Sequence, residues 1–524
     1  MSSVVERKNL TGFGEIEPTF FEKIKGMMPV ILPLLAAIIL IYSRYKFGPG
    51  NFLKEGSLTV LALICYITAA TVMVTNLFVK EKVLYKLGLL TLGLGFCFNF
   101  SGWMIRWIEA GEAEGWKGGI NGFWRYYPLD TLYALTLGFC CGAAIATLVI
   151  VRKPKYEFLG ALALPIIAII LTIAILFGNE IRTLMPILDS YWRPIHVTVA
   201  TVAYGVCLVS FGLAFAYLIK DGVRSEAIAI AVALYGLLIY GTIGDYGIPF
   251  RADYGVLVNI EKSPLPVRAS LPGVGVMMAI TLALILTSMV CFIIEWNRKD
   301  EKLKKLGWNI FRVATVMQIV AIFVLFFQIG QVNKADVAAR VSPVRHEMLG
   351  EWLKKQGLDA PMVGNQQLGN MWLAEKGKEG LLNISAKSNP VEVGAVISLG
   401  VCLFLVALFA WKREALVEAM PSLATIDSLL YKTVGVAFPL LCILLITGAV
   451  WANESWGRYW GWDPKETGAL VATMAYAAFL HTRIAHGWRG RRSAYFALVG
   501  FALVIFTWLG VSFLLVGLHS YAQV

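Results

Sequence analysis

Residues 433–452, TVGVAFPLLCILLITGAVWA, form an apolar run that contains no charged residue. A helix needs about 20 such residues to cross the hydrocarbon core of a bilayer. The same composition extends through the chain: 58% of its 524 residues are hydrophobic, only 15% are charged, and the mean hydropathy is +0.69. This composition excludes a soluble globular protein of this size, a disordered chain, a collagen and a coiled coil.

Apolar runs of this kind recur along the sequence and predict an all-α fold, a polytopic transmembrane helical bundle of about 13 spans. Gly and other small residues within several runs favour close helix packing. The predicted spans are residues 28–43, 57–79, 84–105, 130–151, 157–177, 196–219, 226–247, 272–295, 309–331, 391–411, 433–452, 467–485 and 493–517.

Basic residues gather in alternate loops, which are expected on the cytoplasmic side of the membrane. These loops are 80–86, 152–155, 220–224, 298–305, 412–413 and 486–492. The intervening loops, 106–129, 249–271, 332–390 and 453–466, are then outside. The first ~25 residues carry no cleavable signal pattern. We therefore expect a multi-pass protein of the inner (plasma) membrane, with a cytoplasmic N-terminus, a periplasmic C-terminus and its functional site on the outer side.

The formal net charge of +12 is explained by these basic loops, so no nucleic-acid partner is expected. Membrane lipids are the expected surroundings. All eight cysteines lie inside apolar runs, and the sequence has no CxxC, CxxCH or zinc-type spacing. Disulfides and covalently attached haem are therefore not expected within this chain.

The loop 451–467, WANESWGRYWGWDPKET, places four tryptophans within twelve residues at the outer water interface. A lone interfacial Trp usually belongs to an aromatic belt. The DPKE segment is typical of a helix start, with Asp463 as N-cap and Glu466 at the third helical position. Capping does not explain the tryptophans. Indole faces stacked around a broad aromatic ligand such as a porphyrin do explain them, with Arg458 and Lys465 available for its carboxylates.

Histidines support this interpretation. His196, at the outer end of the sixth span, and His519, just past the thirteenth, are predicted at the level of the tryptophan loop, where two imidazoles ligate one iron axially. A lone His at a helix end is more often only an interfacial side chain. His481 is expected roughly 22 Å deeper, and an intramembrane ionisable residue is a functional candidate. His346 and His486 are expected to be solvated. No second histidine is available to His481 in the inner half of a span, so its opposite ligand must be another residue type or come from another subunit.

The run WANESWGRYWGWDPKET, followed by YAAFLHTRIAHGWRGRR and VGLHSYA, resembles the CcsA (ResC) family of system II cytochrome c biogenesis proteins, which carry the haem-binding WWD motif. The resemblance is dense over 433–524 and extends to 181–205. Related WWD proteins of system I, the CcmC and CcmF types, fit less well, because the PKET ending and the LHSY tail favour CcsA.

The resemblance implies a cytochrome c maturation protein that binds haem b as substrate and presents it for thioether attachment to the CxxCH motif of apocytochrome c. It would work with a CcsB (ResB) partner, as a component of a holocytochrome c synthase. His196 and His519 would be the outer axial pair, and His481 the inner ligand, opposite a histidine of CcsB. The WWD platform would include Trp456, Trp460, Trp462 and Asp463.

Two alternatives are a haem exporter without synthase activity and a respiratory membrane subunit that carries b-type haem. The second predicts histidine pairs on facing spans, which this sequence lacks.

We divide the chain into a cytoplasmic segment 1–27, a transmembrane region 28–219 with His196, additional spans 220–432 with the loop 332–390, and a WWD core 433–524. The 220–432 region is larger than the resemblance requires, and the loop 332–390 is long enough for a small outer subdomain. Residues 106–134 resemble the family only loosely.

Overall fold

The computed structural model describes residues 20–50, 52–116, 123–179, 181, 189–243, 253–260, 263–270, 273–331, 337–358, 362–379, 382–384, 390–515 and 517. Its described part is almost entirely helical, as predicted. Each predicted span falls on a helix, apart from the few positions outside these ranges. Eleven of the described helices are long and apolar enough to cross a membrane. The number of 13 spans and the orientation of the termini remain predictions.

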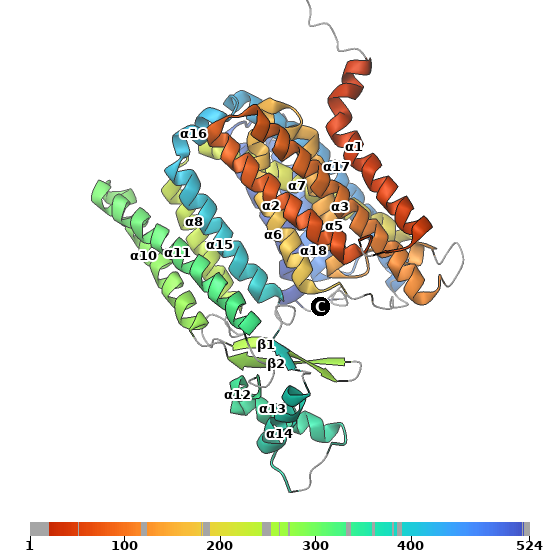
Figure 1. Ribbon diagram of the computed structural model, residues 1–524. Coiled ribbons are helices and arrows are strands. Elements are labelled where there is room, and N and C mark those ends of the chain that lie inside the picture. The colour runs from red at the N-terminus through yellow and green to blue at the C-terminus, as the bar shows by residue number, and fades with distance from the viewer. Residues whose placement is uncertain are drawn as a thin grey trace, which may run out of the picture.

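A main bundle contains the helices before residue 221 and after residue 422, which therefore meet although some 200 residues separate them in sequence (Figure 1). Its core consists mainly of Leu, Ala, Phe and Val side chains. The bundle comprises α1 (Phe20–Phe47), α2 (Glu55–Val79), α3 (Lys82–Glu114), α5 (Leu132–Val151), α6 (Glu157–Phe177), α7 (Trp192–Lys220), α17 (Leu423–Trp456), α18 (Pro464–His486) and α19 (Arg491–Ile505), and it ends with a π-helical turn η6 (Phe506–Gly510) and α20 (Val511–Leu514). A 3-10 turn, η1 (Pro154–Tyr156), precedes α6.

Helices α5 and α7 touch at the backbone inside the main bundle. A Cβ atom added to Gly205 would lie 2.3 Å from the carbonyl carbon of Gly142, and one added to Gly142 would lie 2.6 Å from the carbonyl oxygen of Thr201. Small residues allow this approach where no hydrophobic driving force acts between helices in lipid. The contact fixes α7 against α5.

A second bundle stands beside the main one (Figure 1) and has its own apolar core. It contains α8 (Ser225–Ile243), α10 (Val274–Arg298), α11 (Glu301–Gln331) and α15 (Pro390–Trp411), and the short helix α16 (Arg413–Ala419) leads from it to α17. Its buried polar groups pair with one another. Glu226 accepts a hydrogen bond from the indole of Trp308 at 2.8 Å, and Arg224 pairs with Glu226 and Glu295.

A small domain projects beyond one end of the two bundles (Figure 1). We call it the outer domain after the side of the membrane predicted for the loop 332–390. It contains an antiparallel sheet in the order β2-β1-β3, with β1 (Asp253–Ile260), β2 (Ser263–Ser270) and β3 (Leu382–Ile384), together with α12 (Val337–Arg340), α13 (Pro343–Lys355) and α14 (Asn365–Lys378). The long loop therefore does form a subdomain. The strands were not expected from the sequence, because β2 contains two prolines, which are uncommon inside a sheet.

His346 lies in this outer domain and differs from the sequence-based expectation. It was expected to be solvated, but it is only 7% exposed, and its Nε2 lies 3.1 Å from the carbonyl oxygen of Ala338. The packing of α13 on α14 covers this side chain. His486, at the end of α18, is exposed as expected.

Candidate functional site

A cavity opens at the end of the main bundle where α17 ends and α18 begins, which we call the loop end. α15 leaves the outer domain and α17 returns in the opposite direction, so the outer domain lies at this same end (Figure 1). The cavity holds about 140 Å³ of space and is open to solvent at its mouth. Helices α5, α7, α17 and α18 and the turn η6 line it.

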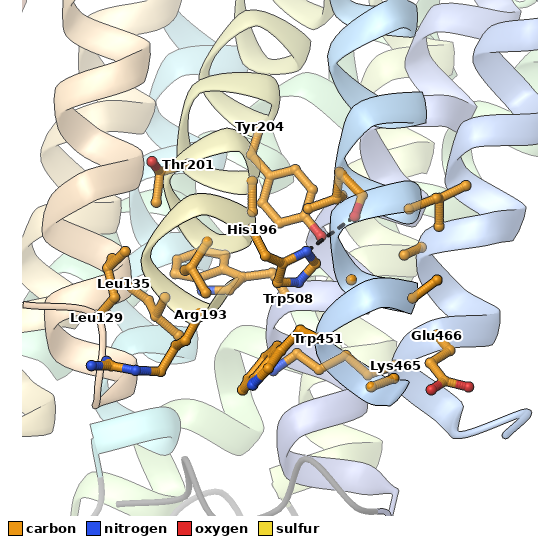
Figure 2. Close-up of a pocket in the computed structure, with 18 of the residues that line it drawn as sticks. Leu129, Leu135, Arg193, His196, Thr201, Tyr204, Trp451, Lys465, Glu466 and Trp508 are labelled. Atoms are coloured by element: carbon orange, nitrogen blue, oxygen red, sulfur yellow. Dashed lines mark hydrogen bonds between the residues drawn. The ribbon is translucent and has the colours of Figure 1, made fainter. Parts of the chain in front are cut away.

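His196 projects into the cavity from the second turn of α7 (Figure 2). Its Nδ1 lies 3.0 Å from the carbonyl oxygen of Leu444 on α17. A carbonyl only accepts, so Nδ1 donates, and in the neutral ring Nε2 carries the lone pair. A metal-ligating histidine is commonly oriented in this way, by a hydrogen bond from its other ring nitrogen.

Gly448, one turn beyond Leu444, makes room for the imidazole. A Cβ atom at this position would lie 2.7 Å from Cε1 and 3.0 Å from Nδ1 of His196. α17 therefore positions the ring in two ways, through a backbone acceptor and through a missing side chain. The sequence predicted His196 at the level of the tryptophan loop, and the structure brings it against Trp451, with ring centroids 5.7 Å apart.

The tryptophans of the loop divide into two sets. Trp451, Trp456 and Trp460 line the cavity, and the rings of Trp451 and Trp456 lie 5.9 Å apart. Trp462 does not line it and is 70% exposed. It packs edge-on against Trp460 at 5.8 Å. Its φ of +56° is unusual for a bulky residue and marks the sharp reversal of the chain before α18.

Asp463 and Glu466 form the capping box that the sequence predicted. The Asp463 carboxylate accepts from the backbone N–H of Lys465 at 3.1 Å, and Glu466 accepts from the N–H groups of Gly461 and Asp463. Asp463 is buried and lies outside the cavity lining. Its observed contacts shape the loop and the start of α18.

Two predicted basic residues take different places. Lys465 lines the cavity, and its ammonium donates to the hydroxyl of Ser512 on α20 at 3.2 Å. Arg458 is exposed and is not part of the lining.

Arg193 is a cavity residue that the sequence reasoning missed. It is buried, three residues before His196 on the same helical face, and it donates to the backbone carbonyl oxygens of Arg125 at 2.8 Å and Tyr127 at 3.4 Å. This ties the segment before α5 to the cavity. Arg193 and Lys465 lie on either side of Trp451 in the view of Figure 2. Its position could have been predicted from the sequence, because residues three apart on a helix, such as Arg193 and His196, share one face.

Trp508 and Tyr204 were also missed. Trp508 lies in the π-helical turn η6, is 4% exposed, and packs edge-on against Phe139 with ring centroids 5.0 Å apart. Tyr204 lies two turns beyond His196 on α7. Both line the deep part of the cavity (Figure 2). Single π-helical turns occur often at functional sites.

The two other predicted histidines are not in the described cavity. His519 lies outside the described residues. Gly517, two residues before it, is described: a Cβ atom there would lie 2.5 Å from Oδ1 of Asp463, so the chain lies against the capping residue at this point. His481 is exposed near the other end of α18, with its ring 5.5 Å from that of His486. Arg483, two residues on, pairs with Asp427 of α17 at 2.5 Å.

Comparison with known sequences identifies the family. The profile described as "Cytochrome C assembly protein" matches residues 129–327 and 393–519, which is more than half of the chain. The chain belongs to this family. The match includes α5 to α11, α15 and the cavity, and it omits residues 328–392, which supply most of the outer domain.

The resemblance to CcsA that the motifs indicated is confirmed. The chain is similar to the cytochrome c biogenesis protein CcsA of Guillardia theta, with 58% identity over 99 residues, 19% of this chain and 33% of that protein. The CcsA proteins of Gloeobacter violaceus and Mesostigma viride are 57% and 54% identical over 97 and 104 residues, 18% and 20% of this chain and 29% and 34% of theirs. These similarities cover about a third of the relatives' length.

Proposed function

We propose that this protein takes part in cytochrome c maturation by binding haem in the loop-end cavity and presenting it to apocytochrome c. Haem is the substrate, and haem b is the form that we propose. The observation that carries the proposal is the placement of His196: the Leu444 carbonyl holds the proton on Nδ1, which leaves the lone pair of the neutral ring on Nε2, and the side chain lies in the lining of an aromatic cavity.

The residues of the cavity fit a haem. Trp451, Trp456 and Trp460 offer indole surface to a flat macrocycle. Two cationic side chains, Arg193 and Lys465, belong to the lining, and we propose that they meet the two propionates. Arg458 would meet a carboxylate only at the mouth. Trp462 and Asp463 would act by shaping the loop that carries Trp460.

We propose His519 as the second axial ligand. The contact between Gly517 and Asp463 supports this assignment. Two residues of extended chain reach at most about 7 Å, so His519 is separated from the described Gly517 by no more than this distance. Ligation by two imidazoles would protect the iron until the histidine of the CxxCH motif replaces one of them.

In the attachment step, the thiol of each CxxCH cysteine adds across one vinyl group of the haem. Sulfur bonds to one vinyl carbon and the proton goes to the other. Nothing leaves, and no oxidant is consumed. The residues of this chain bind and orient the haem so that its vinyl edge faces the acceptor, and proximity of this kind lowers a barrier by several kcal/mol. None of them is required as a covalent nucleophile.

His481 is our proposed ligand for haem at a second, inner site. Its exposed position on α18 supports a site shared with another subunit, for which we propose a CcsB (ResB) partner that supplies the opposite ligand. The ion pair between Arg483 and Asp427 fixes this end of α18 on α17 and leaves the His481 face outward.

Co-expression with a CcsB-type protein and an apocytochrome c tests the proposal. Covalent haem on the CxxCH acceptor is scored for the wild type, His196→Ala, His519→Ala and the double variant, and the haem spectrum of each purified protein is recorded. We expect attachment to fall in each single variant and to disappear in the double variant, with a changed haem spectrum. An unchanged spectrum in the double variant would reject the axial pair.

The same experiment tests two alternative functions. An exporter would give haem-loaded protein but no thioether product, even when the partner is supplied. A respiratory subunit with b-type haem would keep its haem spectrum in the double variant, because its ligands would lie elsewhere.

A further inference from the structure

A shallow apolar groove lies at the end of the bundles opposite the loop end, where the main and second bundles meet. Phe215 and Ile219 of α7, Ile228 of α8, and Phe409 and Ala410 of α15 line it. It encloses only about 10 Å³, which is close to the space for one water molecule, so a larger ligand would lie over it and not inside it. The groove belongs to neither the haem cavity nor the His481 face.

One cation, Arg413, closes the polar end of the groove. Its guanidinium donates to the hydroxyl of Ser225 at 2.9 Å and to the backbone carbonyl of Ile219 at 3.1 Å. These partners within the described chain are neutral, whereas the nearby Arg224 pairs with Glu226 and Glu295. The positive charge at the groove is therefore held in place without a carboxylate to balance it.

Neighbouring side chains place Arg413 at the level of lipid headgroups. Trp411, the last residue of α15, is 67% exposed, and the Lys412 ammonium lies 4.5 Å from the centre of its ring. Trp296, near the same end of α10, is 49% exposed. Exposed tryptophans at span ends lie at the headgroup level. An apolar groove below a cation at this level matches the two parts of a phospholipid.

We infer that an anionic phospholipid binds over this groove, with one acyl chain along the apolar surface of α7, α8 and α15 and the phosphate on Arg413. Basic sites between transmembrane helices bind such headgroups in this way. The lipid would cover the junction between the two bundles. The inference is independent of the proposed haem function.

Binding of phosphatidylglycerol and phosphatidylcholine to the purified full-length protein, measured by native mass spectrometry, tests the inference. We expect preferential retention of phosphatidylglycerol by the wild type. Arg413→Gln should lower it about five-fold, as expected for one cation near an anionic headgroup. Arg298→Gln, the same change at an exposed position of α10, is the matched control and should bind like the wild type.

A second variant keeps the charge and fills the groove. Ala410→Phe should lower phosphatidylglycerol retention to a similar extent. If Arg413→Gln does not elute as a folded protein, this variant alone tests whether the groove binds the lipid. Excess inorganic phosphate should not displace the lipid. Equal retention of the two lipids, or an equal loss in Arg298→Gln, would overturn the inference.

Discussion

The two bundles are built from similar apolar helices, and both pair polar side chains between helices. In the second bundle, Arg224 and Trp308 pair with carboxylates, as Arg483 pairs with Asp427 in the main bundle. The main bundle differs in that His196, Arg193 and Lys465 also line a cavity, where backbone carbonyls or a hydroxyl orient them. Polar groups that satisfy one another stabilise a fold, whereas polar groups oriented toward a space are arranged for a ligand.

The largest difference in haem binding is expected between variants of two histidines that both contact a backbone carbonyl. His196 lies in the cavity, and His346 lies in the outer domain. His196→Ala should weaken and shift the haem absorption bands of the purified protein, because the iron at the outer site loses one of its two proposed axial ligands. His346→Ala should leave the bands intact and cost about 1–3 kcal/mol of outer-domain stability, since it removes a buried hydrogen-bonded group. Haem spectra and thermal unfolding measure the two effects. Loss of the haem bands in His346→Ala would contradict the assignment of haem binding to the cavity alone.

Gly448→Ala should have the next largest effect, a roughly ten-fold or greater loss of haem affinity, because the added methyl displaces the His196 ring. Gly435→Ala on the same helix is the matched control, since its Cβ would meet nothing within 4 Å. Haem titration of the two purified variants measures the difference. Equal affinities would show that the position of the His196 ring does not limit binding.

The two sets of tryptophans predict a smaller difference. Trp460→Leu should weaken haem binding by several-fold, about 1 kcal/mol or somewhat more, because the indole lines the cavity. Trp462→Leu should change affinity less, since that ring is mostly exposed. Both variants are compared in the same titration. A stronger effect at Trp462 would show that the outward ring contacts the ligand or an acceptor protein.

Asp463 should give the smallest effect on binding. Asp463→Ala removes the N-cap of α18 and should cost about 1 kcal/mol of stability. Asp463→Asn keeps a capping oxygen and should restore most of it. Thermal unfolding and haem titration are recorded together. Failure of the Asn variant to bind haem, at normal stability, would assign the carboxylate a direct role in the ligand site.

The sequence was sufficient for the features that depend on local pattern. The apolar runs predicted the helices, DPKE predicted the capping box of α18, and basic loops placed His196 at the level of the tryptophan loop. The inward residues Arg193 and Trp508 were missed because the face that a helix turns toward a cavity depends on its packing partners. A membrane helix that is apolar on all sides gives little sign of that face.

The outer domain was only partly predicted for a different reason. Its sheet joins β1 and β2, from one loop, to β3, from a loop more than 100 residues later. Pairing over such a distance leaves no local pattern, and the prolines in β2 argued against a strand. The length of the 332–390 loop indicated that it could form a subdomain. Nothing in the sequence indicated that the loop 249–271 would add two strands to it.

The backbone contact between α5 and α7 has a consequence for entry into the cavity. Only hydrogen atoms separate the backbones of α5 and α7 at Gly142 and Gly205. No side chain lies between the two helices there that could rotate to open a gap. We therefore expect a large ligand to enter the cavity on another side, such as the one formed by α17 and the tryptophan loop. The two sides belong to opposite halves of the chain. We expect hydrogen exchange to be faster in α17 and the tryptophan loop than at the contact between α5 and α7.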